Sequence, residues 1–523
     1  MDRIPPELLD RIFSHINFKQ REQPPDEVPK KRPAEIPYDL SPLSTISRQW
    51  QHTIERETFR SLQFAIEDLD NFDRIVVGHR RRYLKKLLFK VQFPDYDDET
   101  SKAYETNEDR AANNAMATSC VRRLFSVLSA WDARDEGELG LAFGFNSPGD
   151  RRAVMRDHWV HNGLREKRYE FSYIELEGVE CFPEVHAVTS LWAPLGTRPV
   201  ELRSQYGLAT RVPKAKCVMM LAYEPGIFLA LRRELRHRFL AAVESWPLHS
   251  PEELIYIGFN EPDFEQDESL SNMIAPYAYD RLSTALRQMS LGSTTFEYSG
   301  MMDPTLLWPS PAQGCLQEPH WKNLKNLEVE PYAACPSGKW YFRRKQSPHP
   351  SDEPLPPGAA LELRPPGHYE TEEENIEAEI DADDRSAAEW EMERQQEDDD
   401  RRVNRNIRDW PNDETMRPLL AAFARAIGAM PALRHGKIEF IDRSLPTRFR
   451  VSFAPPGGWA EDEELLDGGR PVASAPRVVA HAWGWEMGEE VEGLFREAGV
   501  KVHGVETVVR YLSKDIYTDI PWS

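Results

Sequence analysis

Cysteine is scarce in this chain of 523 residues, which contains only five. Their number is odd, and no two of them form a Cys-x-x-Cys pair. A disulfide framework or a zinc knuckle requires paired cysteines, so their usage indicates a protein of a reducing compartment. The five are Cys120, Cys181, Cys217, Cys315 and Cys335.

Basic charge and long apolar runs are also lacking. The chain has 65 Lys and Arg residues against 87 Asp and Glu, a net charge of −22. This balance argues against nucleic-acid binding and slightly favours a basic partner protein. No apolar run approaches the roughly 20 residues that span a bilayer. Pro5, Glu7 and Asp10 interrupt the stretch where a secretory signal would lie. We therefore expect a cytoplasmic and/or nuclear protein with no membrane partner.

Motifs of catalysis and cofactor binding are missing as well. The sequence has no glycine-rich dinucleotide fingerprint, no phosphate-binding Gly-Lys-Ser/Thr loop, no Gly-x-Ser-x-Gly elbow and no His-Glu-x-x-His pair. His158 and His161 have a spacing that a metal could use, but no nearby cysteine or third histidine supports a site. We expect no catalytic, cofactor or metal residues, and a protein that is not an enzyme.

Two short amphipathic segments are present near the start of the chain. Prolines 5 and 6 fit a first helical turn, and apolar residues then recur at three- and four-residue steps up to Ile16. In the second segment Ser41 suits an N-cap and Pro42 the first helical position. Leu43, Ile46 and Trp50 follow at helical spacing. Such short helices must pack against another surface to be stable.

The two segments together resemble an F-box. The matches are Ile4-Pro5-Pro6-Glu7 and Ile46-Ser47-Arg48-Gln49-Trp50, and the resemblance covers about sixty residues. It implies a fungal-type F-box protein that binds a Skp-type adaptor and, through it, a cullin. The adaptor-binding residues that it implies are Ile4, Pro5, Pro6, Glu7, Leu8, Leu9, Ile12, Phe13, Leu40, Leu43, Ile46, Ser47 and Trp50.

One feature departs from the F-box pattern. Residues 17–38, with five prolines and mixed charge, separate the two segments, which the family joins by a few residues. A segment of this composition cannot build a core and is expected to be a flexible loop. A long insertion costs little entropy, so adaptor docking can survive it. The alternative is an ordinary helical pair that caps the next domain.

After the F-box, strand and helix patterns alternate. Strands are expected near 87–93, 139–145, 169–175, 254–259, 294–298, 438–440, 449–453 and 505–512, and helices near 111–131, 227–246, 277–289, 416–430 and 488–498. Two places carry a Leu-x-x-Leu-x-apolar spacing, which resembles a leucine-rich repeat. They are Leu84, Leu87, Phe89 and Leu324, Leu327, Val329. We expect an α/β fold with an irregular leucine-rich-repeat-like solenoid after all-α F-box helices; another open α/β sheet is the alternative.

An acidic segment divides this domain. Residues 352–409 contain 20 acidic residues against 7 arginines, and prolines are dense at the front of this stretch. The segment is expected to be a disordered or helical insertion. The predicted units are an F-box at 1–62, repeat-like α/β parts at 63–345 and 413–523, and the flexible insertion at 346–412 between those two parts. The alternation resumes after the insertion, so both parts should belong to one sheet.

Taken together, the patterns favour a substrate-recognition subunit of an SCF-type cullin–RING ubiquitin ligase. The F-box would bind the adaptor, and the C-terminal domain would hold a protein target. A scaffold protein that binds the adaptor without forming a ligase is the alternative, and an enzyme hidden in the long middle is the third reading.

Overall fold

A computed structural model gives the fold. It describes residues 44–97, 100, 103–131, 138–150, 167–169, 171–196, 198–224, 228–246, 248, 251–260, 269–314, 317–344, 354, 364–380, 408, 410–440, 449–458, 474–482 and 484–512.

Twelve strands of the described residues form one open sheet, in the order in which they occur along the chain. All neighbouring strands pair in parallel except at β11–β12 and β12–β13, which are antiparallel. The strands are β1 (Ser61–Ala65), β2 (Lys86–Gln92), β3 (Leu139–Asn146), β4 (Val188–Leu191), β5 (Cys217–Tyr223), β6 (Leu254–Asn260), β7 (Thr295–Gly300), β8 (Asn326–Pro331), β11 (His435–Phe440), β12 (Phe449–Ala454), β13 (Arg477–His481) and β14 (Val508–Tyr511).

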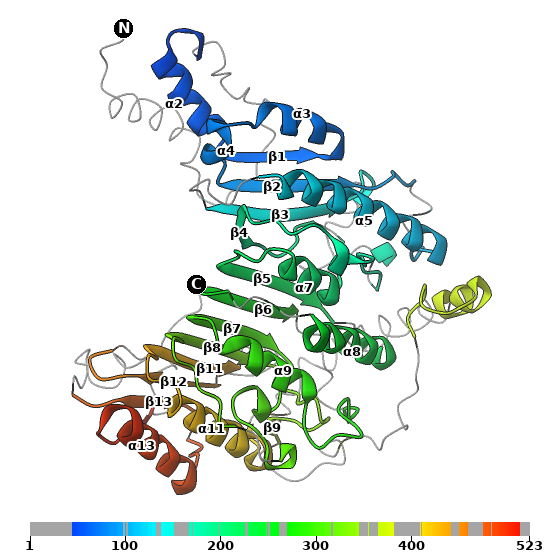
Figure 1. Ribbon diagram of the computed structural model, residues 1–523. Coiled ribbons are helices and arrows are strands. Elements are labelled where there is room, and N and C mark those ends of the chain that lie inside the picture. Colours follow the sequence, from blue (N-terminus) through cyan, green and yellow to red (C-terminus); the bar gives the residue numbers. More distant parts are fainter. Residues whose placement is uncertain are drawn as a thin grey trace, which may run out of the picture.

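Helices connect most of these strands. Figure 1 shows the strands stacked one below another, with α5, α7, α8 and α9 following the same side of the stack. The α-helices are α2 (Arg48–Thr58), α3 (Leu69–Ile75), α4 (His79–Tyr83), α5 (Asn107–Ser129), α7 (Leu202–Thr210), α8 (Leu229–Ser245), α9 (Arg281–Ser290), α11 (Asp413–Ile427) and α13 (Glu489–His503). Short 3-10 turns are η2 (Ile66–Asp68), η4 (Lys167–Tyr169), η5 (Val179–Cys181), η6 (Pro304–Leu306) and η7 (Pro311–Gln313).

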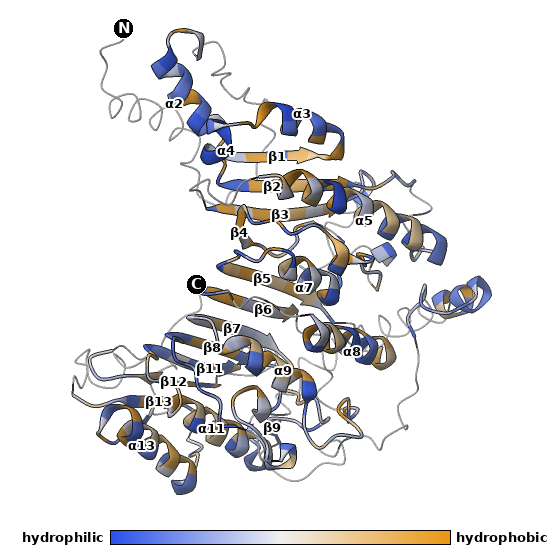
Figure 2. Ribbon diagram, viewed as in Figure 1, coloured by the Kyte–Doolittle hydropathy of each residue, from blue (hydrophilic) through white to orange (hydrophobic). Residues whose placement is uncertain are grey.

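Alternation along the strands separates the two faces of the sheet. In β2 the side chains of Leu87, Phe89 and Val91 are buried, whereas Leu88 and Lys90 between them are half-buried. Strands β5, β7 and β8 show the same alternation. The buried side chains join one hydrophobic cluster that extends through the sheet and its helices. Figure 2 shows β1 to β6 as largely hydrophobic, and α4 as hydrophilic. The face opposite the buried one is called the open face below.

Side-chain caps mark where several helices begin. The Thr106 hydroxyl accepts a hydrogen bond from the Asp109 amide at the start of α5 (3.1 Å). The Asp280 carboxylate does the same for Leu282 and Ser283 in α9. Asn412 caps α11 by accepting from the Glu414 amide. Each cap satisfies amides that have no partner inside the helix, so these starts are encoded locally.

The structure confirms most of the elements predicted from periodicity. The exception is the strand predicted at 169–175, which is wrong. Residues 167–169 form a 3-10 turn, and only Ile174 makes an isolated bridge, with Val200. The aromatic residues that produced the alternation, Phe171 and Tyr173, instead pack with Phe228 and Leu231 in a separate small cluster. Alternation there reflects a local aromatic cluster and not a place in the sheet.

The sheet continues across the acidic insertion. Strand β8 pairs with β11 in parallel, which confirms that both folded parts share one sheet. A two-stranded ribbon of β9 (Phe342–Arg343) and β10 (Trp410–Pro411) closes the base of the insertion. Residues 372–380 form a helix that stands away from the sheet in Figure 1.

Part of the insertion is docked on the sheet domain. The Nε2–H of His368 donates to the Phe171 carbonyl (2.6 Å), and the Asn107 side-chain amide donates to the Tyr369 carbonyl (2.9 Å). Burial and then the charge of Arg110 lower the pKa of His368 to about 4, so this imidazole is neutral near pH 7. Gly367 has φ +81°, and a Cβ there would lie 2.8 Å from the Glu105 carbonyl oxygen, so only glycine fits this turn.

The fold is therefore mixed α/β with a large, mostly parallel sheet that is not closed. In the part of the chain that the structure describes, no helix has both the length and the apolar character needed to cross a membrane.

Candidate functional site

Most of the expected adaptor-binding residues lie outside the described residues. These are Ile4, Pro5, Pro6, Glu7, Leu8, Leu9, Ile12, Phe13, Leu40 and Leu43, together with the inserted loop 17–38. His158 and His161 also lie outside them.

The end of the F-box-like motif is described, and it begins helix α2. The Ser47 hydroxyl accepts from the Trp50 amide (3.4 Å) and caps the helix, and Trp50 in the first turn is half-buried. Ile46, directly before the cap, is 44% exposed. The start of α2 therefore presents an exposed isoleucine directly before its capping serine.

Helix α2 is tied to the sheet domain by a cluster of charges. Both oxygens of the Glu55 carboxylate are used: Arg80 binds one (2.7 Å) and His79 the other (2.9 Å). The Arg80 hydrogen bond is the main cause that lowers the pKa of Glu55 to about 2. Because Arg80 and His79 belong to α4, this cluster fixes the orientation of α2 relative to the first strands.

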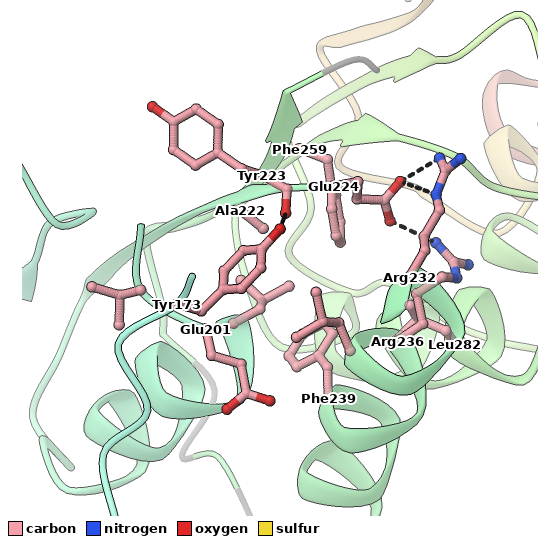
Figure 3. Close-up of a pocket in the computed structure, with 13 residues that line it drawn as sticks. Tyr173, Glu201, Ala222, Tyr223, Glu224, Arg232, Arg236, Phe239, Phe259 and Leu282 are labelled. Atoms are coloured by element: carbon pink, nitrogen blue, oxygen red, sulfur yellow. Dashed lines mark hydrogen bonds and ion pairs between the residues drawn. The ribbon is translucent and has the colours of Figure 1, made fainter. Parts of the chain in front are cut away.

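A pocket opens between α7, α8 and the ends of β5 and β6 (Figure 3). On one side of it, the Glu224 carboxylate binds Arg232 (2.9 Å to Nε) and Arg236 (3.4 Å to Nη1). Arg236 also binds Asp280 (3.0 Å). These buried charges neutralise one another, so the cluster fixes α8 against α9 and leaves little charge for a ligand.

Glu201 lies on the opposite side of the pocket (Figure 3). It is 2% exposed, and one carboxylate oxygen has no hydrogen-bond partner among the described residues. Burial, and then the charge of Glu175, raise its pKa to about 7. The cavity volume is about 20 Å³, which is room for one water molecule. A small-molecule site is an order of magnitude larger, so this pocket does not suit an organic substrate.

The open face of the sheet is the larger surface. On β2, β5, β7 and β8 its side chains come from the half-buried positions, whereas Lys437 and Glu439 on β11 are buried. The strand register places these side chains in rows. One row contains Met219, Tyr256, Glu297, Glu328 and Lys437, each directly opposite the next on the neighbouring strand. Glu330 lies two residues along β8 from Glu328, opposite Ser299.

Carboxylates are concentrated where this row crosses β7 and β8. Lys437 forms ion pairs with Glu328 (3.4 Å) and with Glu439 of its own strand (3.2 Å). Arg450 on β12 also binds Glu439. Among the described residues, Glu297 and Glu330 have no ion pair, although both are half-buried. At these two positions the open face therefore has carboxylates that form no ion pair with a basic side chain of the described residues.

The pKa values reflect this excess. Burial and then Glu328 and Glu330 raise the pKa of Glu297, and the charge of Lys437 offsets this increase in part. Burial raises the pKa of Glu330. The charge of Lys437 offsets this increase in part, and Glu439 and Glu328 raise the pKa further. Burial acts to raise the pKa of Glu439 too, but Arg450 and Lys437 outweigh it and lower that pKa. The ion-paired carboxylate is thus stabilised as an anion, whereas the charged forms of Glu297 and Glu330 are disfavoured.

A tyrosine borders the carboxylates. Tyr256 on β6 lies opposite Glu297. Its ring leans along its own strand toward Gly258, where a Cβ would lie 2.9 Å from the ring carbon Cζ. Gly258 therefore makes the room for this ring on the open face. Burial, Glu330 and Glu297 raise the pKa of Tyr256, so its hydroxyl stays protonated.

The other end of the open face has the opposite charge. Lys86 and Lys90 extend from β2, and the Lys86 ammonium lies 5.4 Å from the centre of the Trp192 ring. The face therefore changes from basic at β2, through apolar residues of β5 such as Met219 and Leu221, to acidic at β7 and β8. In the described residues no group of His, Cys, Asp or Glu is arranged to hold a metal ion.

Comparison with known proteins returns no match: no family model, no curated protein and no solved structure is similar to this chain.

The acidic positions of the open face were not singled out from the sequence. Their signal is visible in the strand that reads Asn326-Leu-Glu-Val-Glu-Pro331, where the residues between the buried Leu327 and Val329 are acidic. The sequence does not reveal that Glu297, thirty-one positions earlier than Glu328, lies opposite it, because register across parallel strands is set by tertiary packing.

Proposed function

We propose that this chain is the substrate-recognition subunit of a cullin–RING ubiquitin ligase. Residues at the amino-terminal F-box-like segments bind a Skp-type adaptor, and the sheet domain binds a protein target. The chain carries out no chemistry itself; it acts by holding the target close to the conjugating enzyme, which raises the effective concentration of the reacting groups. The compartment that fits this role is the cytoplasm or the nucleus.

The observation that carries the proposal is the motif Ile46-Ser47-Arg48-Gln49-Trp50 at the start of α2. Ser47 caps the helix, and Ile46 remains exposed directly before it, as a partner-facing residue should. The sheet domain supports the second half of the proposal. Its strands follow one another in chain order, with the two Leu-x-x-Leu motifs leading into β2 and β8 and their leucines buried. This order is typical of leucine-rich-repeat solenoids, which bind proteins on the strand face.

Adaptor binding tests the proposal directly. Because Ile46 is already 44% exposed, Ile46→Asp should leave the fold intact while weakening capture by a Skp-type adaptor by about tenfold or more. Val77 is 46% exposed and lies outside the motif, so Val77→Asp is the matched control and should bind as the parent does. Leu8→Asp tests the first segment in the same assay.

Undiminished adaptor binding by folded Ile46→Asp and Leu8→Asp proteins contradicts the assignment. Co-purification of a cullin together with the adaptor supports a ligase, whereas adaptor without cullin supports a scaffold protein that does not form one.

A further inference from the structure

The acidic end of the open face contains an arrangement that works against the stability of the sheet. Glu297 on β7 and Glu328 on β8 are directly opposite each other, where side chains lie about 5 Å apart. Like charges in this position destabilise a sheet. Nearby Lys437 is shared between Glu328 and Glu439 and does not form an ion pair with Glu297. A local rule is broken here, and among the described residues Lys437 offsets the repulsion only in part, which is typical of functional surfaces.

The arrangement of these carboxylates selects the kind of cation that fits. Glu297, Glu328 and Glu330 are spread over two strands, and they do not converge on a point where a metal ion could lie. Glu328 and Glu330 are two residues apart on one strand, a distance of about 7 Å. An extended peptide presents alternate side chains on one face at the same interval. Glu328 and Glu330 therefore match two basic side chains at alternate positions of such a peptide, and Glu297 lies beside Glu328 on the neighbouring strand.

Tyr256 and the apolar residues of β5 complete the surface. A lysine or arginine side chain has an apolar stem as well as a charged end, and the stem packs favourably against an aromatic ring. The Tyr256 ring lies beside the carboxylates, with Met219 in the adjoining position of the row. Anionic partners such as nucleic acids are repelled from this end of the face.

We propose that the open face at β6, β7 and β8 binds an extended protein segment with lysine or arginine at alternate positions. The basic side chains contact Glu297, Glu328 and Glu330, and at least one stem packs on Tyr256. The claim that this segment belongs to a ligase target rests on the proposed function. The claim that the open face binds a basic segment does not depend on it.

The test uses the full chain and a synthetic seven-residue peptide with three lysines at alternate positions separated by glycine. The site variant is Glu297→Gln with Glu330→Gln. The matched control is Glu373→Gln with Glu377→Gln, which removes the same charge from exposed positions of the helix at 372–380. The site variant should weaken peptide binding about tenfold, and the control by less than about twofold. A peptide with glutamine in place of lysine should not bind.

Equal weakening by the two double variants would show non-specific attraction to an acidic protein and would overturn the proposal, as would unchanged binding by the site variant. Adaptor capture separates this inference from the proposed function. The site variant should still bind the adaptor, and Ile46→Asp should still bind the peptide. If the chain has no ligase role but still binds the peptide, the open face remains a binding surface for basic segments. Its natural occupant is then not a ligase target.

Discussion

Glu297 and Glu328 lie directly opposite each other on neighbouring parallel strands, and only Glu328 is ion-paired among the described residues. A sheet that served stability alone would place opposite charges or uncharged residues at this pair. The surface therefore keeps a small internal repulsion that a positively charged partner would relieve.

Neutralising one member of this pair should stabilise the isolated protein. Glu297→Gln removes the carboxylate whose pKa is raised by burial, Glu328 and Glu330, so its charged form is disfavoured in the folded state. We expect a gain of about 0.5 kcal/mol in the free energy of unfolding at pH 7, measured by urea denaturation. Glu373→Gln, on the exposed helix at 372–380, serves as the control and should change little. A clear loss of stability in Glu297→Gln would show that the carboxylate is satisfied in the fold.

The buried carboxylate of Glu201 should make the protein less stable at higher pH. Its folded pKa of about 7 lies above the ordinary value of 4.5, so its stabilising contribution is complete below pH 4.5 and is lost as pH rises through 7. Glu201→Gln should remove this dependence and exceed the parent in stability by about 1–3 kcal/mol at pH 8. Arg238 keeps Glu175 and Glu234 as ion-pair partners in the variant. Parallel pH curves for the two proteins would contradict this account.

His368 should have the opposite effect in acid. Its folded pKa of about 4 lies below the ordinary 6.5, so the docked turn is fully stabilised above pH 6.5 and loses stability as pH falls through 4. We expect the backbone amides around 364–375 to lose protection against hydrogen exchange when the pH falls from above 6.5 to 5, after correction for intrinsic rates. The core amides should lose less protection over the same range. In His368→Gln, which retains a donor for the Phe171 carbonyl, this extra acid sensitivity should disappear. Equal acid sensitivity in the variant would exclude His368 as its cause.

Glu55 should control how firmly α2 is held. Glu55→Gln leaves Arg80 and His79 without their shared carboxylate, and we expect a loss of about 1–2 kcal/mol at neutral pH. Because the folded pKa of Glu55 is about 2, the contribution is present above pH 4.5 and fades as pH falls through 2, so the two proteins should converge in acid. Equal stability of the two proteins at pH 7 would show that α2 is held by its apolar contacts alone. Glu57→Gln, on the same helix, is the control.

Local patterns predicted the elements well, because their causes are local. The alternation of β2 and the capped start of α5 are both determined by residues that are consecutive in the sequence. Strands β1, β4, β5 and β13 were missed. Three of them, β1, β4 and β13, have only four or five residues with little polar alternation. Strand β5, Cys217–Tyr223, has an almost continuous apolar run in which no period can be recognised.

The candidate site was harder to predict than the fold. A motif within ten residues identified Ile46, Ser47 and Trp50, but the charged surface of the open face depends on which strands become neighbours. Glu297, Glu328 and Lys437 come from three strands, and a long acidic insertion lies between the last two. No local pattern records that they share one row. Only the packing of buried side chains on the other face, such as Tyr298 and Val329, fixes that register.

The agreement between strand order and chain order has a consequence for how the molecule forms. From β2 to β8, every strand pairs with the one made just before it, so a nascent chain can extend the sheet one edge at a time during synthesis. The step from Pro331 to His435 is different, because the chain must cross the insertion before β11 can reach β8. Until then β8 is an unprotected parallel edge. Interrupted translation within the insertion would thus leave a sheet able to pair with a second unfinished copy, and aggregation should be greatest for chains stopped there.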